Sequence, residues 1–214
     1  VDILQILIAA DELDLEWLYN YTMNYFIEKC EDYIKENPVK ILQLIYTNEN
    51  FKELKNIYLE KFCKYSEKLF ESSEFKSLEK PILLEILKRD DFSVDEIVIW
   101  ENVIKWGLAQ HPSFSANIRD WGAEEFQALA STLHECIHLV RFFQMSSSDL
   151  YDKVWASFRA ILPLDLEDDI VRCHLKPGSK PIFGINTPRE NSTLVVHQQM
   201  SRIADWIDRK EAPT

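Results

Sequence analysis

The segment of this sequence that could most directly perform chemistry is His134-Glu135-Cys136-Ile137-His138. Two histidines four residues apart on a helix present their rings on one face, where they can bind a zinc ion. A glutamate next to the first histidine can then act as the general base of a zinc peptidase. The pattern therefore raises the hypothesis of a zinc metallopeptidase. This hypothesis requires that the surrounding helix direct both histidines into a cleft.

The helix expected over residues 123–143 gives that hypothesis little support. Its apolar stripe lies on the side opposite His134 and His138, so both rings are expected to face water rather than a cleft. No further histidine follows at the spacing of the known zinc-peptidase motifs, which leaves Asp149 and Glu167 as loose candidates for a third ligand. We therefore favour a solvated histidine pair and keep the peptidase as a remote alternative.

Other patterns that would indicate an enzyme are absent from the sequence. It has no glycine-rich phosphate loop and no nucleophile elbow. The four cysteines are far apart, which argues against a structural zinc site or a disulfide framework and favours a reducing compartment (Cys30, Cys63, Cys136, Cys173). We expect a protein without catalytic residues, metal or cofactor, located in the cytoplasm or nucleus.

The charge of the chain limits its partners. With 36 acidic and 24 basic side chains, the 214 residues carry a formal net charge of -12. Such a field repels polyphosphates, so nucleic acid is not an expected partner. No apolar run approaches the roughly 18 residues that cross a bilayer, so no membrane contact is expected.

The elements that position these residues are predicted to be helices. Only four glycines are present, too few for many tight hairpins, and apolar residues recur three or four apart. One face of the first long helix is predicted to be buried (Leu15, Leu18, Tyr19, Thr22, Tyr25, Phe26, Cys30). Asn37-Pro38 separates it from a helix through Ile45, and a longer helix is expected over residues 51–70.

Three further expectations concern the second half of the chain. Ser93 and Glu96 have the spacing of a capping box that begins a helix. Trp100 and Trp106 are expected to pack in the core rather than to anchor a partner. Arg141 is expected to pair with an acidic residue between packed helices.

The composition of the sequence changes after His174. Lys176-Pro177-Gly178-Ser179-Lys180-Pro181 is the densest cluster of proline and glycine, which predicts a linker and a domain boundary. Beyond it, residues 193–196 could form a short strand, and Met200, Ile203, Ala204 and Ile207 recur at helical spacing.

Several stretches resemble the BACK domain, the helical module that follows a BTB (POZ) domain in kelch-like and related proteins. Residues 8–15 are similar to the end of a BTB domain. Residues 83–92 and 96–106 are similar to the leucine-rich helix, acidic turn and Trp-ending helix of BACK, and residues 139–143 to a later segment. The tail, residues 203–210, resembles the entry into a TLDc domain.

This resemblance implies an all-α fold of stacked helical hairpins. Residues 1–13 would end a BTB domain, residues 14–175 would form the BACK domain, and residues 176–214 would be a linker and the start of a possible TLDc domain. In the family, the BTB domain dimerises and supplies most of the contact with the cullin scaffold of a RING ubiquitin ligase. A downstream domain recognises the protein substrate.

The resemblance also implies a second cullin contact on the first BACK helices. We expect a hydrophobic groove between the helices of residues 38–47 and 51–63, although packing in the core explains each lining residue equally well (Ile41, Ile45, Tyr46, Phe51, Leu54, Tyr58). The predicted function is therefore that of a non-enzymatic adaptor. A passive helical spacer or other protein-interaction module without a ligase role is the alternative.

Overall fold

The computed structural model describes residues 3–176 and 178–189, and helices are the only regular secondary structure within them. The all-α class expected from the sequence is confirmed. The chain divides after Ile86 into two compact units, here called unit 1 and unit 2. The strand predicted at residues 193–196 and the helix predicted through Ile207 lie outside the described residues, as does the segment that resembles a TLDc domain.

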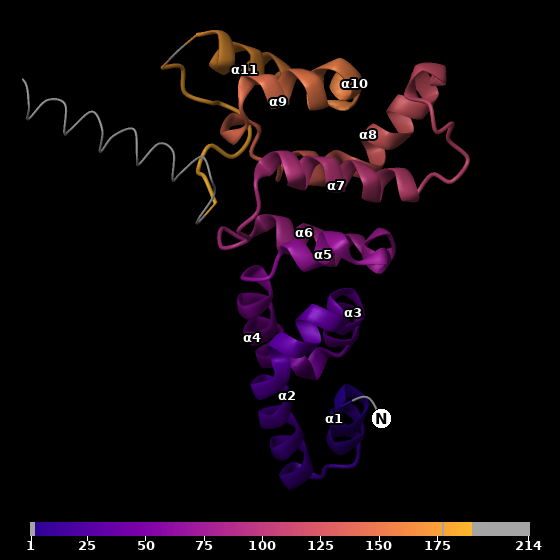
Figure 1. Cartoon of the computed structure of the whole chain (residues 1–214), viewed down its shortest axis with the longest axis vertical. Helices are drawn as coiled ribbons and strands as arrows, with labels where there is room; N and C mark the ends of the chain where they lie inside the picture. The colour runs from indigo at the N-terminus through magenta and orange to yellow at the C-terminus, as the bar shows by residue number, and fades with distance from the viewer. Residues whose placement is uncertain (1–2, 177, 190–214) are drawn as a thin grey trace, which may run out of the picture. The chain divides into compact units, whose positions relative to one another are not determined.

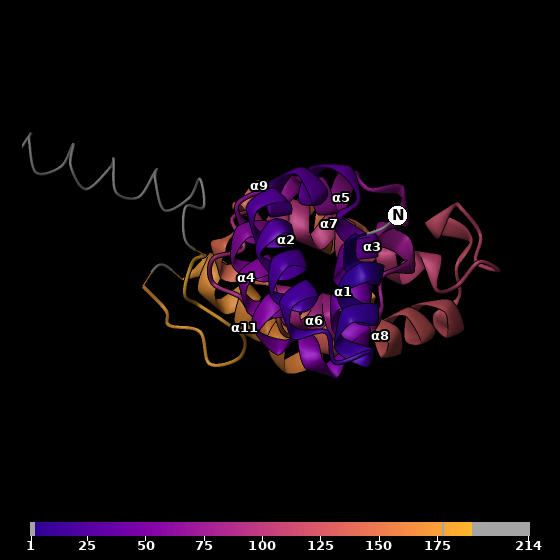
Figure 2. The same ribbon diagram turned by 90° about the horizontal axis from the view of Figure 1, so that it is seen from below.

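Unit 1 is built around its longest helix. This helix, α2, lies beside both α1 and α4 (Figures 1 and 2). Between α1 and α2 the chain turns at Asp14, whose φ of 53° is left-handed, a conformation that aspartate tolerates better than most residues. The elements of unit 1 are α1 (Ile3–Glu12), α2 (Glu16–Glu36), α3 (Pro38–Thr47), η1 (Glu49–Phe51), α4 (Lys52–Cys63), α5 (Glu67–Glu71), η2 (Ser73–Ser77) and most of α6 (Lys80–Lys88).

Aromatic rings form much of the core of unit 1. Phe26 of α2 and Tyr58 of α4 are fully buried, with ring centroids 6.2 Å apart. The Tyr58 hydroxyl donates a hydrogen bond of 3.3 Å to the carbonyl of Pro38 at the start of α3. The expected break at Asn37-Pro38 is confirmed, because α2 ends at Glu36 and proline occupies the first turn of α3.

The helix expected over residues 51–70 is interrupted. Helix α4 ends at Cys63, where the amides of Lys64 and Tyr65 donate to the carbonyls of Lys61 and Phe62, three residues earlier. These tighter bonds end the α-helix and turn the chain before α5 begins. The buried Ser66 marks the turn.

Unit 2 pairs two long helices, α7 and α8, at close range. A methyl group added to Gly107 of α7 would lie 2.8 Å from the nearest side-chain carbon of Leu133 of α8, so the absence of a side chain permits this approach. Unit 2 contains α7 (Glu96–Ala109), η3 (Ile118–Asp120), α8 (Ala123–Ile137), η4 (Phe142–Gln144), α9 (Ser147–Asp149), the π-helix η5 (Leu150–Trp155), α10 (Ala156–Phe158), η6 (Arg159–Ile161) and α11 (Leu164–Leu175).

Two predicted helix boundaries differ from the structure. Helix α7 begins at Glu96, its N-cap residue Asp95 makes no side-chain capping hydrogen bond, and the buried Glu96 carboxylate pairs with Arg189 of unit 2. Helix α8 ends at Ile137 rather than Phe143. The Arg141 amide donates to Glu96 Oε2 at 3.0 Å, so it does not continue the helical ladder.

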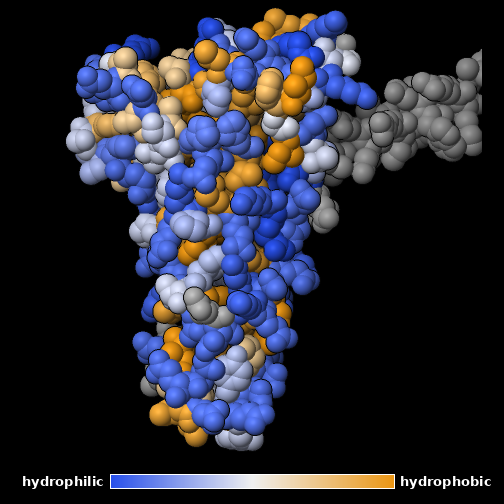
Figure 3. Space-filling model, turned by 180° about the vertical axis from the view of Figure 1, so that it is seen from behind, coloured by the Kyte–Doolittle hydropathy of each residue, from blue (hydrophilic) through white to orange (hydrophobic). Residues whose placement is uncertain are grey.

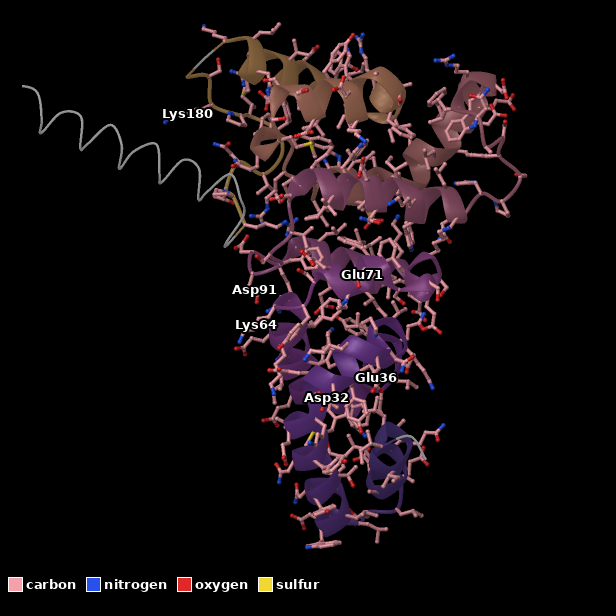
Figure 4. All side chains as sticks on the ribbon, viewed as in Figure 1. Asp32, Glu36, Lys64, Glu71, Asp91 and Lys180 are labelled. Carbon is pink, nitrogen blue, oxygen red and sulfur yellow. The ribbon has the colours of Figure 1, made fainter. Side chains whose placement is uncertain are left out.

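The segment after α11 is held against unit 2 rather than standing apart as a linker. We call its described part, residues 178–189, the strap. The Asp169 carboxylate of α11 accepts hydrogen bonds from the amides of Ile182 and Phe183, at 2.7 and 2.8 Å. Arg141 donates to the carbonyl of Thr187 at 2.9 Å. Lys180, labelled in Figure 4, lies in this strap.

Candidate protein-binding surfaces

The six residues predicted to line a cullin groove do not form an open groove. Five of them are at most 4% exposed and pack in the core of unit 1 (Ile41, Ile45, Phe51, Leu54, Tyr58). Tyr46 is partly exposed, and the Lys55 ammonium lies 3.9 Å from the centroid of its ring. A cullin contact by these residues stays a prediction, and only Tyr46 is reachable without separating α3 from α4.

The accessible apolar surface of unit 1 lies instead on α2. Trp17, Tyr21 and Tyr25 are 76%, 59% and 42% exposed, and the rings of Trp17 and Tyr21 stack with centroids 5.6 Å apart. We call these three residues the aromatic stripe. Leu13 and Leu15 are also exposed before it, so hydrophobic side chains reach the surface at the end of unit 1 where α1 leads into α2 (Figure 3).

The aromatic stripe was not predicted from the sequence, although the spacing of its residues indicates it. Residues four apart on a helix share a face, so Trp17, Tyr21 and Tyr25 lie together, opposite the buried Phe26 and Cys30. The prediction that Leu15 and Tyr25 are buried is therefore wrong. Apolar residues three and four apart in α2 predict a single buried face. The exposed fractions of these side chains show instead that α2 has one buried and one exposed apolar face.

The surroundings of the stripe are acidic. Residues 11–28 contain five carboxylates and no lysine or arginine (Asp11, Glu12, Asp14, Glu16, Glu28). Further along α2 the exposed residues are charged, as Asp32 and Glu36 illustrate (Figure 4). Exposed tryptophan and tyrosine side chains are typical of protein interfaces, and the acidic surroundings suit a partner with basic residues.

A buried ionic cluster lies in unit 2. Glu96 Oε1 is 2.6 Å from Arg189 Nε, and Arg141 Nη2 is 2.5 Å from Asp90 Oδ1. Arg141 and Arg189 are each 1% exposed. Burial lowers the pKa of Arg189, while the Glu96 carboxylate opposes that change. The predicted pairing of Arg141 with an acid is confirmed, and we regard the cluster as structural because Glu96 and both arginines are buried, although Asp90 reaches solvent.

The histidine motif lies where the sequence predicted, on the exposed side of α8. His134 and His138 are both exposed, and their ring centroids are 4.9 Å apart. The candidate third ligands are engaged elsewhere, since Asp149 accepts a hydrogen bond from Ser146 and Glu167 pairs with Arg159. Within residues 3–176 and 178–189, no group of three histidine, cysteine, aspartate or glutamate side chains could hold a metal ion.

Unit 2 also carries an apolar pocket of about 280 Å³ between the π-helix η5 and α11. Tyr151 and Leu175 stand at its edge, 64% and 78% exposed. The expected core role of the tryptophans is confirmed nearby, because Trp100 and Trp106 are 1% and 3% exposed. The Trp100 indole N–H donates to the carbonyl of Lys153 at 3.2 Å, which ties α7 to η5.

Comparison with known families identifies the chain. The model of the BACK family, described as BTB And C-terminal Kelch, matches residues 39–154, more than half of the sequence. The chain belongs to the BACK family. No curated protein and no solved structure matches it. Among the described residues, no helix is long and apolar enough to cross a membrane.

The BACK match runs through both units. It begins at Val39 in α3 and ends at Val154 in η5, so the α3–α4 pair and the histidine motif of α8 lie within the BACK domain. The aromatic stripe on α2 and the strap lie outside the matched residues. The family is one of non-catalytic adaptor domains.

Proposed function

We propose that this chain is the non-enzymatic adaptor segment of a BTB-BACK protein, which links a cullin-RING E3 ubiquitin ligase to a domain that recognises the substrate. The match of residues 39–154 to the BACK family carries the proposal. A BTB domain would supply dimerisation and most of the cullin contact. A downstream domain, which residues 203–210 identify by resemblance as TLDc, would bind the protein substrate. This assembly would work in the cytoplasm or nucleus.

Two accessible surfaces of unit 1 could add to the cullin contact. Tyr46 is the reachable member of the predicted groove, and the aromatic stripe on α2 is the larger exposed apolar surface. Large aromatic side chains contribute most to binding when a partner covers them and excludes water. We therefore expect at least one of the two surfaces to contribute to cullin affinity.

Calorimetric titration of the full-length protein, including its BTB domain, against the N-terminal domain of the cullin tests this proposal. We expect Tyr46→Ala, or Trp17→Ala together with Tyr21→Ala, to weaken binding at least tenfold, about 1.4 kcal/mol. Tyr151→Ala is the matched control, because Tyr151 is an exposed tyrosine of unit 2. If only the double variant Trp17→Ala, Tyr21→Ala binds the cullin domain more weakly, the contact lies on the aromatic stripe rather than in the predicted groove.

The passive spacer is the second candidate function, and one observation favours it. Five of the six predicted groove residues are needed for packing, so the α3–α4 pair offers a partner little apolar surface. A spacer holds flanking domains apart without contacting the cullin. If the folded full-length protein releases no heat with the cullin domain, the ligase role is refuted and the spacer replaces it.

A further inference from the structure

The histidine pair on α8 takes no part in the proposed adaptor function, yet its geometry suits a metal ion. His134 and His138 lie on adjacent turns at the C-terminal end of the helix, and both side chains are exposed. Neither is an isolated surface residue, because their rings contact each other edge to face, with an angle of 72° between the ring planes.

The separation of the rings matches the separation in a metal chelate. A transition-metal ion lies about 2.1 Å from each imidazole nitrogen, which places it about 3.2 Å from each ring centre. Two rings in neighbouring coordination positions, at angles of about 90 to 110°, then have centres about 4.5 to 5.2 Å apart. The observed distance of 4.9 Å between the ring centroids falls within this interval, so both imidazoles can reach one ion once the exposed rings turn out of their edge-to-face contact.

The electrostatic surroundings on α8 also favour a cation. Glu135 lies next to His134, and residues 123–138 contain no lysine or arginine. His138 is the C-cap of the helix, where the unpaired carbonyl groups carry partial negative charge.

From this arrangement we propose that His134 and His138 form a surface site for a divalent late transition-metal ion. Imidazole nitrogen selects copper, nickel and zinc over magnesium and calcium, which prefer oxygen. The two side chains leave at least two positions of a tetrahedral ion to water. The site therefore exchanges its metal with solvent and lacks the third protein ligand of a zinc peptidase.

Calorimetric titration of the untagged chain with NiCl2 tests the proposal. We expect one nickel ion per chain, with affinity falling at least tenfold in His134→Ala and in His138→Ala, because each variant reduces a chelate to a single ligand. His174→Ala is the matched control and should bind nickel within twofold of the unmodified chain. MgCl2 should give no heat at the same concentrations.

Electron paramagnetic resonance of the Cu²⁺ complex provides a second measurement. The unmodified chain should show coupling to two imidazole nitrogens, and His134→Gln should show coupling to one. Because both side chains are exposed, these variants should keep the helical circular dichroism of the unmodified chain. The proposal is overturned if the unmodified chain shows no heat of nickel binding. It is also overturned if both alanine variants bind nickel as tightly as the unmodified chain. Neither result depends on whether the protein binds a cullin.

Discussion

Glu96 lies between two buried arginines and contacts both. Its carboxylate accepts the Arg189 Nε–H at 2.6 Å and the Arg141 backbone amide at 3.0 Å. Removing two guanidinium groups from water costs free energy unless carboxylates compensate their charge. Asp90, the other acid in contact with Arg141, has a side chain that is 72% exposed. Glu96 is therefore the buried carboxylate that compensates Arg189, whereas Asp90 makes the closer ion pair with Arg141.

The first prediction concerns this residue. Glu96→Gln should lower the free energy of unfolding by about 3 to 5 kcal/mol, because it leaves the buried Arg189 guanidinium without its carboxylate partner. Glu101→Gln is the control on the same helix, since Glu101 pairs with Lys153 at the surface, and it should cost about 0 to 1 kcal/mol. Urea denaturation followed by circular dichroism measures both. Equal losses in the two variants would show that the cluster does not stabilise unit 2.

At the scale of elements, one side chain of α11, Asp169, binds two successive backbone amides of the strap. Burial raises the pKa of Asp169, but hydrogen bonds from Phe183, Arg172 and Ile182 outweigh that effect, so the pKa lies below its ordinary value. A depressed carboxyl pKa stabilises the folded state above the ordinary value, and this stabilisation is lost as the pH falls through the folded-state value. The strap should therefore stay bound near neutral pH and loosen only below pH about 4.

The second prediction follows from this anchor. Asp169→Asn replaces the carboxylate oxygen that accepts both backbone amides, so hydrogen exchange at Ile182 and Phe183 should accelerate at least tenfold at pH 7. Asp168→Asn changes the neighbouring exposed residue and should leave exchange at both amides unaltered. Protection that survives in Asp169→Asn would mean that other contacts, such as the hydrogen bond from Arg141 to Thr187, hold the strap without Asp169.

At the scale of the whole molecule, the two compact units contain cysteines that can report on each unit separately. Cys30 and Cys63 are buried in unit 1 and Cys136 is buried in unit 2, whereas Cys173 is partly exposed. Burial raises the pKa of the Cys30 thiol to about 11, which further slows its reaction in the folded state. Alkylation in the native state should therefore modify Cys173 first.

The third prediction is that the units respond separately to a local change. Glu96→Gln destabilises unit 2, so it should accelerate alkylation of Cys136 severalfold and leave the rate at Cys30 unchanged. Mass spectrometry of iodoacetamide-labelled chains over time distinguishes the cysteines. Equal acceleration at Cys30 and Cys136 would show that the two units unfold as one cooperative body.

The sequence by itself determined the helical class, the break at Asn37-Pro38 and the family. Few glycines and a repeat of three to four residues leave helices as the main way to bury the apolar side chains, and proline cannot continue a helix that precedes it. The pairing of Arg141 and the burial of Trp100 were also predictable, because large or charged side chains within apolar stripes have few other places to lie.

Only the tertiary structure decided how Glu96, the aromatic stripe and the strap are used. From spacing alone, Glu96 is predicted to cap a helix. In the structure its carboxylate instead accepts hydrogen bonds from the Arg141 amide and the Arg189 guanidinium, 45 and 93 positions away. Proline and glycine predicted that residues 176–181 are irregular, which is correct for the described part, but not that residues 182 and 183 would donate to Asp169. These outcomes depend on contacts between distant residues, which local periodicity does not encode.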